Sequence, residues 1–262
     1  MSKDLSENIG LPVTLNDQNK LEFGEVIEYE GESVRSMADL SVVAADETLK
    51  LEDKPAYFMY RNVHRKGDEE TINTNNQRFD LTVIPSGSLG KEFIKTSGHY
   101  HPVKPGAEVE YPELYYVISG QATYLMQKHE PDGSISDVII SRVRPGEAII
   151  MPLGYGHVTI NELDEPLVMA NWVEKNFKSE YGDFETKRGA AYYLNSDGSL
   201  VKNPAYDDLP DARELKSSPQ AIADLKDTPI YKYVEQFNKI KLIAEPENHL
   251  DEFKIDKLFT KE

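Results

Sequence analysis

Short apolar runs, each bounded by turn-forming residues, follow one another along the chain from Pro55 onward. The segments RFDLTVIPSG, ELYYVISGQATYLMQKHEP, SDVIISRVRPGEAIIMPLG and PLVMANWVEK are rich in Val, Ile, Thr and Tyr. Runs of this kind predict antiparallel strands. Pro and Gly within 85–90, 131–134 and 144–147 predict sharp turns, and 190–204 predicts a further hairpin. We therefore expect an all-β fold, either a barrel or a double-sheet jelly roll.

The two flanking regions have a different texture. Residues 1–54 are polar and acidic and predict an N-terminal arm over the core, with a short helix in SVRSMADL behind Ser33 or Ser36. Residues 207–262 are charged and interrupted by prolines, and they predict helices in SPQAIADLK and PIYKYVEQFNKIKLIAE. We divide the chain into an arm (1–54), a barrel (55–206) and a C-terminal extension of mixed helix and loop (207–262). The extension is expected to pack on the barrel or on a partner subunit.

Composition narrows the classes of function. The chain has 262 residues, of which 39% are hydrophobic, enough for a substantial core. Its net charge of −17 argues against nucleic acid and against anionic membranes as partners. The absence of cysteine excludes disulfides, thiol catalysis and iron–sulfur clusters. The sequence shows no signal peptide and no membrane-spanning run, which favours the cytoplasm.

Histidines and glutamates gather in TSGHYHPVKPGAEVEYPELYYVISG, at residues 96–120. In an extended segment His99 and His101 share one face. Glu113 opens the following strand, and His157 lies in GEAIIMPLGYGHVTIN, behind a bend formed by a Pro and a Gly. Two histidines on one strand, a carboxylate on a second and a third histidine on another make up the ligand set that a divalent metal ion prefers.

Each motif alone has a simpler interpretation. A single His-x-His in a strand is usually a pair of polar surface residues, and turn formation suffices to explain a Pro-x-Gly bend. The two motifs together in a strand-rich chain favour metal binding.

These motifs resemble those of the cupin superfamily, which are small β-barrels with a metal site. Over a longer part of the chain, residues 33–206 resemble the cupin-type glucose-6-phosphate isomerases best known from archaea. The resemblance is carried by FDLTVIPSGSLGKEFIKTSGHYH, ELYYVISG, PGEAIIMPLGYGHVTIN, EPLVMANW, EYGDFETKRGAAYYL and VKNP. It implies a cupin double-stranded β-helix, a jelly-roll barrel with an N-terminal arm and a helical C-terminal extension.

The resemblance also implies roles for individual residues. The metal ligands would be His99, His101, Glu113 and His157. The sugar-phosphate contacts would be Thr82, Thr96, Gly98, Tyr115 and Tyr181. Glu113 and Tyr115 would be catalytic. Threonine hydroxyls and a glycine N–H suit phosphate oxygens, although the threonines alone are explained by strand propensity.

The chain departs from the family pattern at three points. A longer link, PVKPGAEVEYP, follows His101, so Glu108 and Glu110 are rival ligands to Glu113. Val173 and Ser179 stand where the archaeal members carry polar pocket residues. The C-terminal extension has no counterpart in the short archaeal form.

The resemblance implies interconversion of D-glucose 6-phosphate and D-fructose 6-phosphate, in glycolysis and gluconeogenesis. The hydrogen would move either as a proton through Glu113 or as a hydride between carbons. The expected cofactor is Fe²⁺, with Mn²⁺, Zn²⁺ or Ni²⁺ as alternatives. The expected partners are a phosphorylated sugar and a second copy of the chain in a homodimer. An Fe(II)-dependent cupin oxygenase and a non-catalytic sugar-phosphate binding module are the competing functions.

Overall fold

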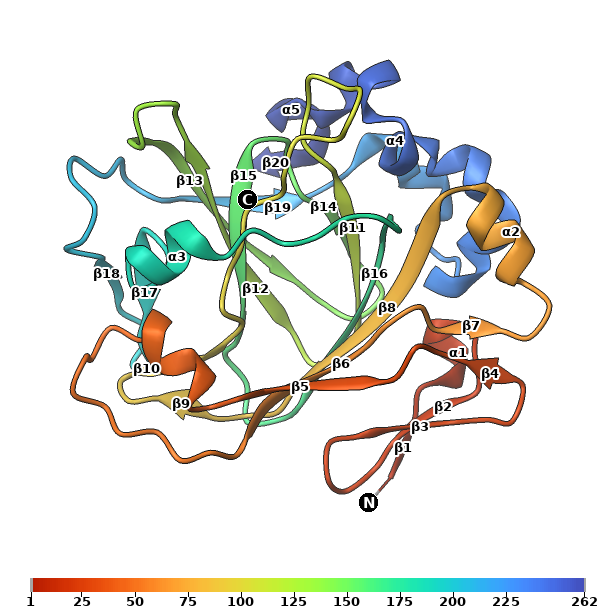
Figure 1. The fold of residues 1–262 in the computed structure, drawn as a ribbon, viewed down its shortest axis with the longest axis horizontal. Helices are drawn as coiled ribbons and strands as arrows, with labels where there is room; N and C mark the ends of the chain where they lie inside the picture. Colours follow the sequence, from red (N-terminus) through yellow and green to blue (C-terminus); the bar gives the residue numbers. More distant parts are fainter. Residues whose placement is uncertain (1, 262) are drawn as a thin grey trace.

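Two large, mainly antiparallel β-sheets packed face to face form the centre of the molecule (Figure 1). The computed structural model describes residues 2–261. One sheet has seven strands, in the order β20 (Phe259–Lys261), β19 (Arg213–Ser217), β13 (Ile135–Val143), β12 (Ala122–His129), β15 (Tyr155–Asn161), β10 (Glu92–Lys95) and β9 (Ser88–Leu89). The other has six, in the order β14 (Ala148–Ile150), β11 (Glu113–Ser119), β16 (Leu167–Glu174), β8 (Gln77–Ile84), β6 (Pro55–Tyr60) and β5 (Glu32–Ser36). The predicted all-β jelly-roll barrel is confirmed.

Smaller elements surround the barrel. Three short sheets are formed by β1 (Lys3–Asp4), β2 (Val13–Leu15) and β3 (Leu21–Phe23), by β4 (Ile27–Glu28) and β7 (His64–Arg65), and by β17 (Tyr192–Leu194) and β18 (Leu200–Lys202). The α-helices are α1 (Ser6–Ile9), α2 (Glu69–Thr74), α3 (Gly182–Thr186), α4 (Lys241–Ala244) and α5 (Ile255–Leu258). The 3₁₀ helices are Asp39–Val43, Gln220–Leu225, Ile230–Lys239, Pro246–Asn248 and Leu250–Phe253. Because β17 and β18 pair antiparallel, the hairpin predicted over 190–204 is confirmed.

The six-stranded sheet is covered on both faces. All residues of β11 and β16 are buried, and consecutive side chains point to opposite faces. Tyr115 and Asn171 line the cavity inside the barrel. Trp172 points outward, where its indole N–H donates to the carbonyl of Ile230 at 3.0 Å. The barrel wall therefore separates the cavity from a second apolar layer.

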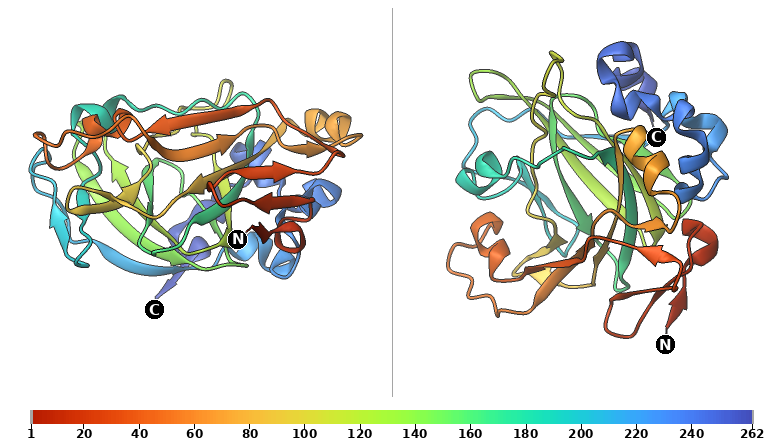
Figure 2. Two further views of the ribbon diagram at one scale, coloured as in Figure 1. Left: turned by 90° about the horizontal axis from the view of Figure 1, so that it is seen from below. Right: turned by 45° about the vertical axis from the view of Figure 1, so that its right-hand side comes forward.

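The C-terminal extension supplies that second layer. Its blue ribbon lies along one side of the barrel, next to α2 (Figures 1 and 2). Tyr231 and Phe237 pack on the Trp172 ring, and Phe79 joins them. The extension also adds β19, parallel to β13, and β20 to the seven-stranded sheet. The extension thus combines helical turns with strands of the barrel sheet.

One local prediction is right only in part. A helix behind Ser33 is wrong, because residues 33–36 belong to the edge strand β5 and pair with β6. A short 3₁₀ helix follows at Asp39–Val43, and Ser36 Oγ accepts the backbone N–H of Asp39 at 3.1 Å. The alternative with Ser36 as the capping residue is therefore confirmed, although the helix is of the 3₁₀ type and begins only at Asp39. In the described part of the chain, no helix is long and apolar enough to cross a membrane.

Candidate metal centre and substrate cavity

The His-x-His segment lies directly beside β15. His99 and His157 exchange two backbone hydrogen bonds, of 3.1 and 3.0 Å, which bring their rings to a centroid distance of 4.5 Å. His99 and His101 stack with centroids 5.1 Å apart, whereas the intervening Tyr100 points away and stacks on His129. The alternation expected for an extended segment therefore places both imidazoles on one side.

Gly98 allows this close approach. Its φ is +78°, a conformation that L residues with a side chain rarely adopt. A Cβ built there would lie 2.4 Å from Val158 Cγ1 and 2.5 Å from Phe184 Cδ1. Only glycine fits here without displacing neighbouring side chains. It therefore lets the segment that carries the two histidines lie close to β15.

Four potential ligand atoms converge. One donor atom from each of His99, His101, Glu113 and His157 lies within 4.8 Å of all the others. Glu113 Oε2 is 3.4 Å from His101 Nε2 and 4.0 Å from His99 Nε2. Glu113 belongs to this cluster, and the rival candidates Glu108 and Glu110 do not.

The hydrogen bonding of these groups fits a metal ion. His99 Nε2, His101 Nε2 and Glu113 Oε2 are buried and have no hydrogen-bond partner. His101 Nδ1 lies 2.7 Å from the carbonyl oxygen of Tyr111, which orients the ring and leaves Nε2 facing the cluster. Buried polar atoms are almost always paired, so these converging atoms could hold a cation.

Electrostatics also favour metal binding. Burial lowers the pKa of His99 well below its usual value, and the nearby His157, His101 and Arg61 lower it further. Burial and His101 lower the pKa of His157 in the same direction. Neutral imidazoles have a free lone pair, which is the form that binds metals.

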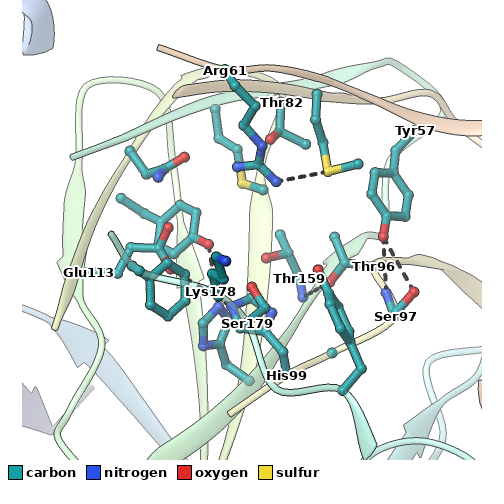
Figure 3. Close-up of a pocket in the computed structure, with 18 of the residues that line it drawn as sticks. Tyr57, Arg61, Thr82, Thr96, Ser97, His99, Glu113, Thr159, Lys178 and Ser179 are labelled. Atoms are coloured by element: carbon teal, nitrogen blue, oxygen red, sulfur yellow. Dashed lines mark hydrogen bonds and ion pairs between the residues drawn. The ribbon is translucent and has the colours of Figure 1, made fainter. Parts of the chain in front are cut away.

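A cavity of about 360 Å³ opens beside the cluster (Figure 3). The expected sugar-phosphate residues all lie on its wall: Thr82, Thr96, Gly98, Tyr115 and Tyr181. Of the cluster, His99, Glu113 and His157 line the cavity. Thr96 Oγ1 accepts the Thr159 backbone N–H at 3.0 Å, so its own hydroxyl hydrogen is free to donate. The structure thus brings the predicted residues together around one space.

Tyr115 is a neutral hydrogen-bonding group. Its Oη lies 3.4 Å from His157 Nε2. Burial raises the pKa of Tyr115 well above its usual value, and the charge of Glu113 adds to the effect. A phenol held neutral donates a hydrogen bond but is a poor base at neutral pH.

Several cavity residues carry no motif. Among them are Tyr57, Arg61, Ser97, Asn171 and Lys178. Tyr57, Met59 and Arg61 line the cavity at every second position along β6 and just after it, a period of two that could have located them had that strand been assigned an inner face. Asn171 is a polar residue inside the apolar run LVMANWV, which is a weak signal. Val173, one of the departures from the family pattern, packs against Tyr111 and Phe177, and Ser179 lines the cavity.

The fold defines the class of protein: this is a cupin, a jelly-roll barrel whose inner wall carries the His/His/Glu/His cluster. Residues 34–211 match the family described as "Glucose-6-phosphate isomerase (GPI)". The chain belongs to the glucose-6-phosphate isomerase family.

Two sequence relatives, both named glucose-6-phosphate isomerase, agree with this assignment. Glucose-6-phosphate isomerase of Thermococcus onnurineus is 30% identical over 179 residues, 66% of this chain and 86% of that protein. The Pyrococcus furiosus protein of the same name is 27% identical over 69% of this chain and 91% of its own length.

Among solved structures, oxalate decarboxylase of Bacillus subtilis has 20% identity, a TM-score of 0.33 and coverage of 47% of this chain and 28% of that one. Vicilin from hazelnut, Corylus avellana, has 15% identity, a TM-score of 0.35 and coverage of 49% and 32%.

Proposed function

We propose that this chain is a metal-dependent glucose-6-phosphate isomerase, which interconverts D-glucose 6-phosphate and D-fructose 6-phosphate in glycolysis and gluconeogenesis. The observation that carries the proposal is the meeting of four potential ligand side chains, each with a buried polar atom that lacks a hydrogen-bond partner, with compact hydroxyl donors around one cavity. Family membership supports the same reaction. The cavity is large enough for an open-chain sugar phosphate.

The proposed ligands are His99, His101, Glu113 and His157, and the proposed ion is Fe²⁺. Mn²⁺, Zn²⁺ and Ni²⁺ are alternatives, because three imidazoles and one carboxylate accept all of them. A bound ion would polarise the sugar carbonyl and stabilise negative charge on the adjacent oxygen.

The protein residues then bind the sugar and move its hydrogen. Thr82, Thr96 and Gly98 would hold the phosphate, and Tyr181 would close the outer side of the cavity. Tyr115 would donate a hydrogen bond to a sugar oxygen. Glu113 would take the proton from C2 of glucose 6-phosphate and return it to C1, as general base and then general acid.

The route of the hydrogen is testable. A proton held on Glu113 exchanges with solvent, so isomerisation in D₂O should place deuterium on the product carbon. We expect labelled product by NMR. Unlabelled product at full turnover would mean that hydride passes directly between the carbons.

A coupled assay tests the proposal itself. The purified chain, reconstituted with Fe²⁺, is mixed with fructose 6-phosphate, and glucose 6-phosphate is measured through its dehydrogenase. We expect turnover that a chelator removes and added metal restores. No product after reconstitution with any of the four metals would overturn the proposal. Oxygen uptake would then favour an oxygenase, and sugar-phosphate binding without turnover a non-catalytic module.

We also propose a cytoplasmic homodimer. The edge strand β5 lacks a neighbour on one side within residues 2–261, and Val34 on it is 44% exposed. Such an edge is suited to pairing with a second copy. Light scattering coupled to gel filtration would give twice the 29.7 kDa chain mass. A mass equal to that of one chain would contradict the proposed homodimer.

A further inference from the structure

A row of polar side chains crosses the six-stranded sheet and ends at the candidate metal centre. Its members are Arg61, Asp80, Asn171 and Tyr115. Asp80 pairs with Asn171 across β8 and β16, and Asn171 pairs with Tyr115 across β16 and β11. Arg61, next to the end of β6, reaches Asp80 through a 2.7 Å ion pair. Tyr115 contacts His157, so the row connects the wall of the barrel to the metal ligands.

Asp80 holds two guanidinium groups. Its side chain is fully buried, and Oδ2 lies 2.7 Å from Arg61 Nη1 and 2.9 Å from Arg78 Nε. The backbone N–H of Asn62 donates to Oδ1 at 2.9 Å. Arg78 also donates to the carbonyl of Lys175 at 3.3 Å. One carboxylate therefore faces two guanidinium groups, so these three side chains together carry one positive charge.

Arg61 and Asn171 each have a donor without an oxygen partner. The second amino group of Arg61, Nη2, lies 3.2 Å from Met59 Sδ, and a thioether is a weak acceptor. Asn171 is only 2% exposed, and its Nδ2 has no hydrogen-bond partner. Both residues line the cavity, and Figure 3 shows the Arg61 guanidinium directed into it. The Arg61 side chain is 34% exposed and faces the cavity, and the Asn171 amide beside it is buried, so the two donors point to a ligand rich in oxygen.

The charge of Arg61 acts at the metal end of the cavity. Burial opposes that charge, but Asp80, and after it Glu113 and Tyr115, raise the pKa of Arg61 above its usual value. Arg61 is also among the groups that lower the pKa of His99. This guanidinium is therefore electrostatically coupled to the residues at which the carbonyl of the sugar would lie.

We propose that Arg61 and Asn171 bind the C1 and C2 oxygens of the open-chain sugar phosphate beside the metal centre, with Asp80 as the residue that positions Arg61. The inference rests on the isomerase function proposed above. Negative charge develops on these oxygens while hydrogen moves between the carbons. A fixed cation and a fixed amide donor stabilise that charge without rearranging. The phosphate, at the other end of the substrate, would remain with the threonines.

Calorimetry with three probes tests the placement on the metal-loaded protein. The first probe, 6-phosphogluconate, carries a carboxylate at the reacting end; glucitol 6-phosphate is neutral there; inorganic phosphate lacks the sugar. We expect Arg61→Met to weaken the binding of 6-phosphogluconate about ten- to hundredfold, the range for the loss of a hydrogen bond to a charged group. The affinities for the other two probes should change by less than about threefold. Arg61→Lys should retain part of the 6-phosphogluconate affinity that Arg61→Met loses.

A kinetic readout accompanies the binding data. Arg61→Met and Asn171→Ala should each lower kcat for fructose 6-phosphate by about tenfold or more, with a smaller change in KM, because the lost contacts strengthen in the transition state.

Arg78→Met is the matched control. It removes the other ion pair of Asp80, so it shares any structural effect of losing a guanidinium there. Arg78 also lines the cavity, but its Nε is engaged by Asp80 and its Nη1 by the Lys175 carbonyl, so we expect Arg78→Met to keep 6-phosphogluconate affinity within about threefold. Urea unfolding establishes that every variant is folded.

Three outcomes would overturn the inference. Equal weakening of all three probes by Arg61→Met would place Arg61 at the phosphate. Unchanged affinity of Arg61→Met for 6-phosphogluconate would mean that Arg61 does not contact the ligand. An equal loss of affinity in Arg78→Met would mean that the effect comes from a changed structure around Asp80. Failure of the isomerase proposal is distinguishable, because the wild-type protein would then bind 6-phosphogluconate through Arg61 without converting fructose 6-phosphate.

Discussion

A single glycine sets the approach of the two histidines to β15, and its replacement should be costly. Gly98→Ala adds a side chain at φ +78° and places it 2.4 Å from Val158. We expect a loss of about 2–5 kcal/mol in unfolding free energy, from backbone strain and overpacking together. Gly133→Ala is the control, because its φ is also positive, at +83°, but nothing lies within 4 Å of the new Cβ. It should cost about 1–2 kcal/mol. Equal losses by urea unfolding would show that packing around Gly98 contributes nothing.

The four proposed ligands make a second residue-scale prediction. His157→Ala should lower metal affinity by more than about tenfold, since even the loss of groups that orient ligands costs that much. Metal per chain is measured by mass spectrometry after dialysis. His249→Ala, in the C-terminal extension and outside the cluster, should leave the metal content unchanged. Unaltered metal in His157→Ala would mean that the ligand assignment is wrong.

At the scale of the element, β10 contains a buried ion pair that supports its neighbours. Lys95 and Glu92 are 3% and 1% exposed and contact each other, Glu92 also accepts the Ala45 N–H at 2.8 Å, and Lys95 lies over the Tyr193 ring. Burial lowers the pKa of Lys95, and Glu92 opposes this shift. The pair thus connects the N-terminal arm and the 190–204 hairpin to the strand that leads into Thr96.

Removing one partner of this pair should be worse than removing both. Lys95→Met leaves a buried carboxylate without its cation, and we expect a loss of about 3–5 kcal/mol in unfolding free energy. Adding Glu92→Gln should recover part of that loss, because no unpaired charge then remains. Urea unfolding of both variants at neutral pH measures the difference. A double variant no more stable than the single one would show that the charge of Glu92 is not the cause.

Elements were predictable from sequence where the signal was local. Turn residues and β-branched runs located the strands and the 190–204 hairpin, and motif spacing selected the four clustered side chains. The choice between Ser33 and Ser36 as the cap of the short helix stays open in the sequence, because local propensity does not include the pairing of residues 33–36 with β6. Arg61 and Asn171 were missed for a related reason. A lone Arg or Asn carries no pattern, and only cross-strand register places them in one row.

At the scale of the whole molecule, the C-terminal extension is part of the barrel's packing. The division of the chain at 54/55 and 206/207 stays a prediction, yet the two large sheets take strands from both sides of these boundaries: β5 precedes the first, and β19 and β20 follow the second. Strand β16 is apolar apart from Asn171 and its last residue, Glu174, as is usual for a strand buried on both faces. The sequence did not reveal which segment covers the outer face, because the extension is mostly polar and its apolar residues are widely spaced.

Deleting residues 207–262 should therefore expose the outer face of β16. It should also destabilise the strand whose inner face lines the cavity. Trp172 would lose its hydrogen bond to Ile230 and its contacts with Tyr231 and Phe237. Phe237→Ala alone should cost about 3–5 kcal/mol, the usual range for a buried aromatic, and the deletion should cost more. Trp172 is the only tryptophan, so its fluorescence reports directly on this contact, with red-shifted emission expected in the truncated chain. Because Asn171 is the adjacent residue on the cavity face, kcat should fall together with stability. If the truncated chain unfolds at the same urea concentration with unshifted emission, the barrel stands without the extension, and the extension must have a role other than supporting the site.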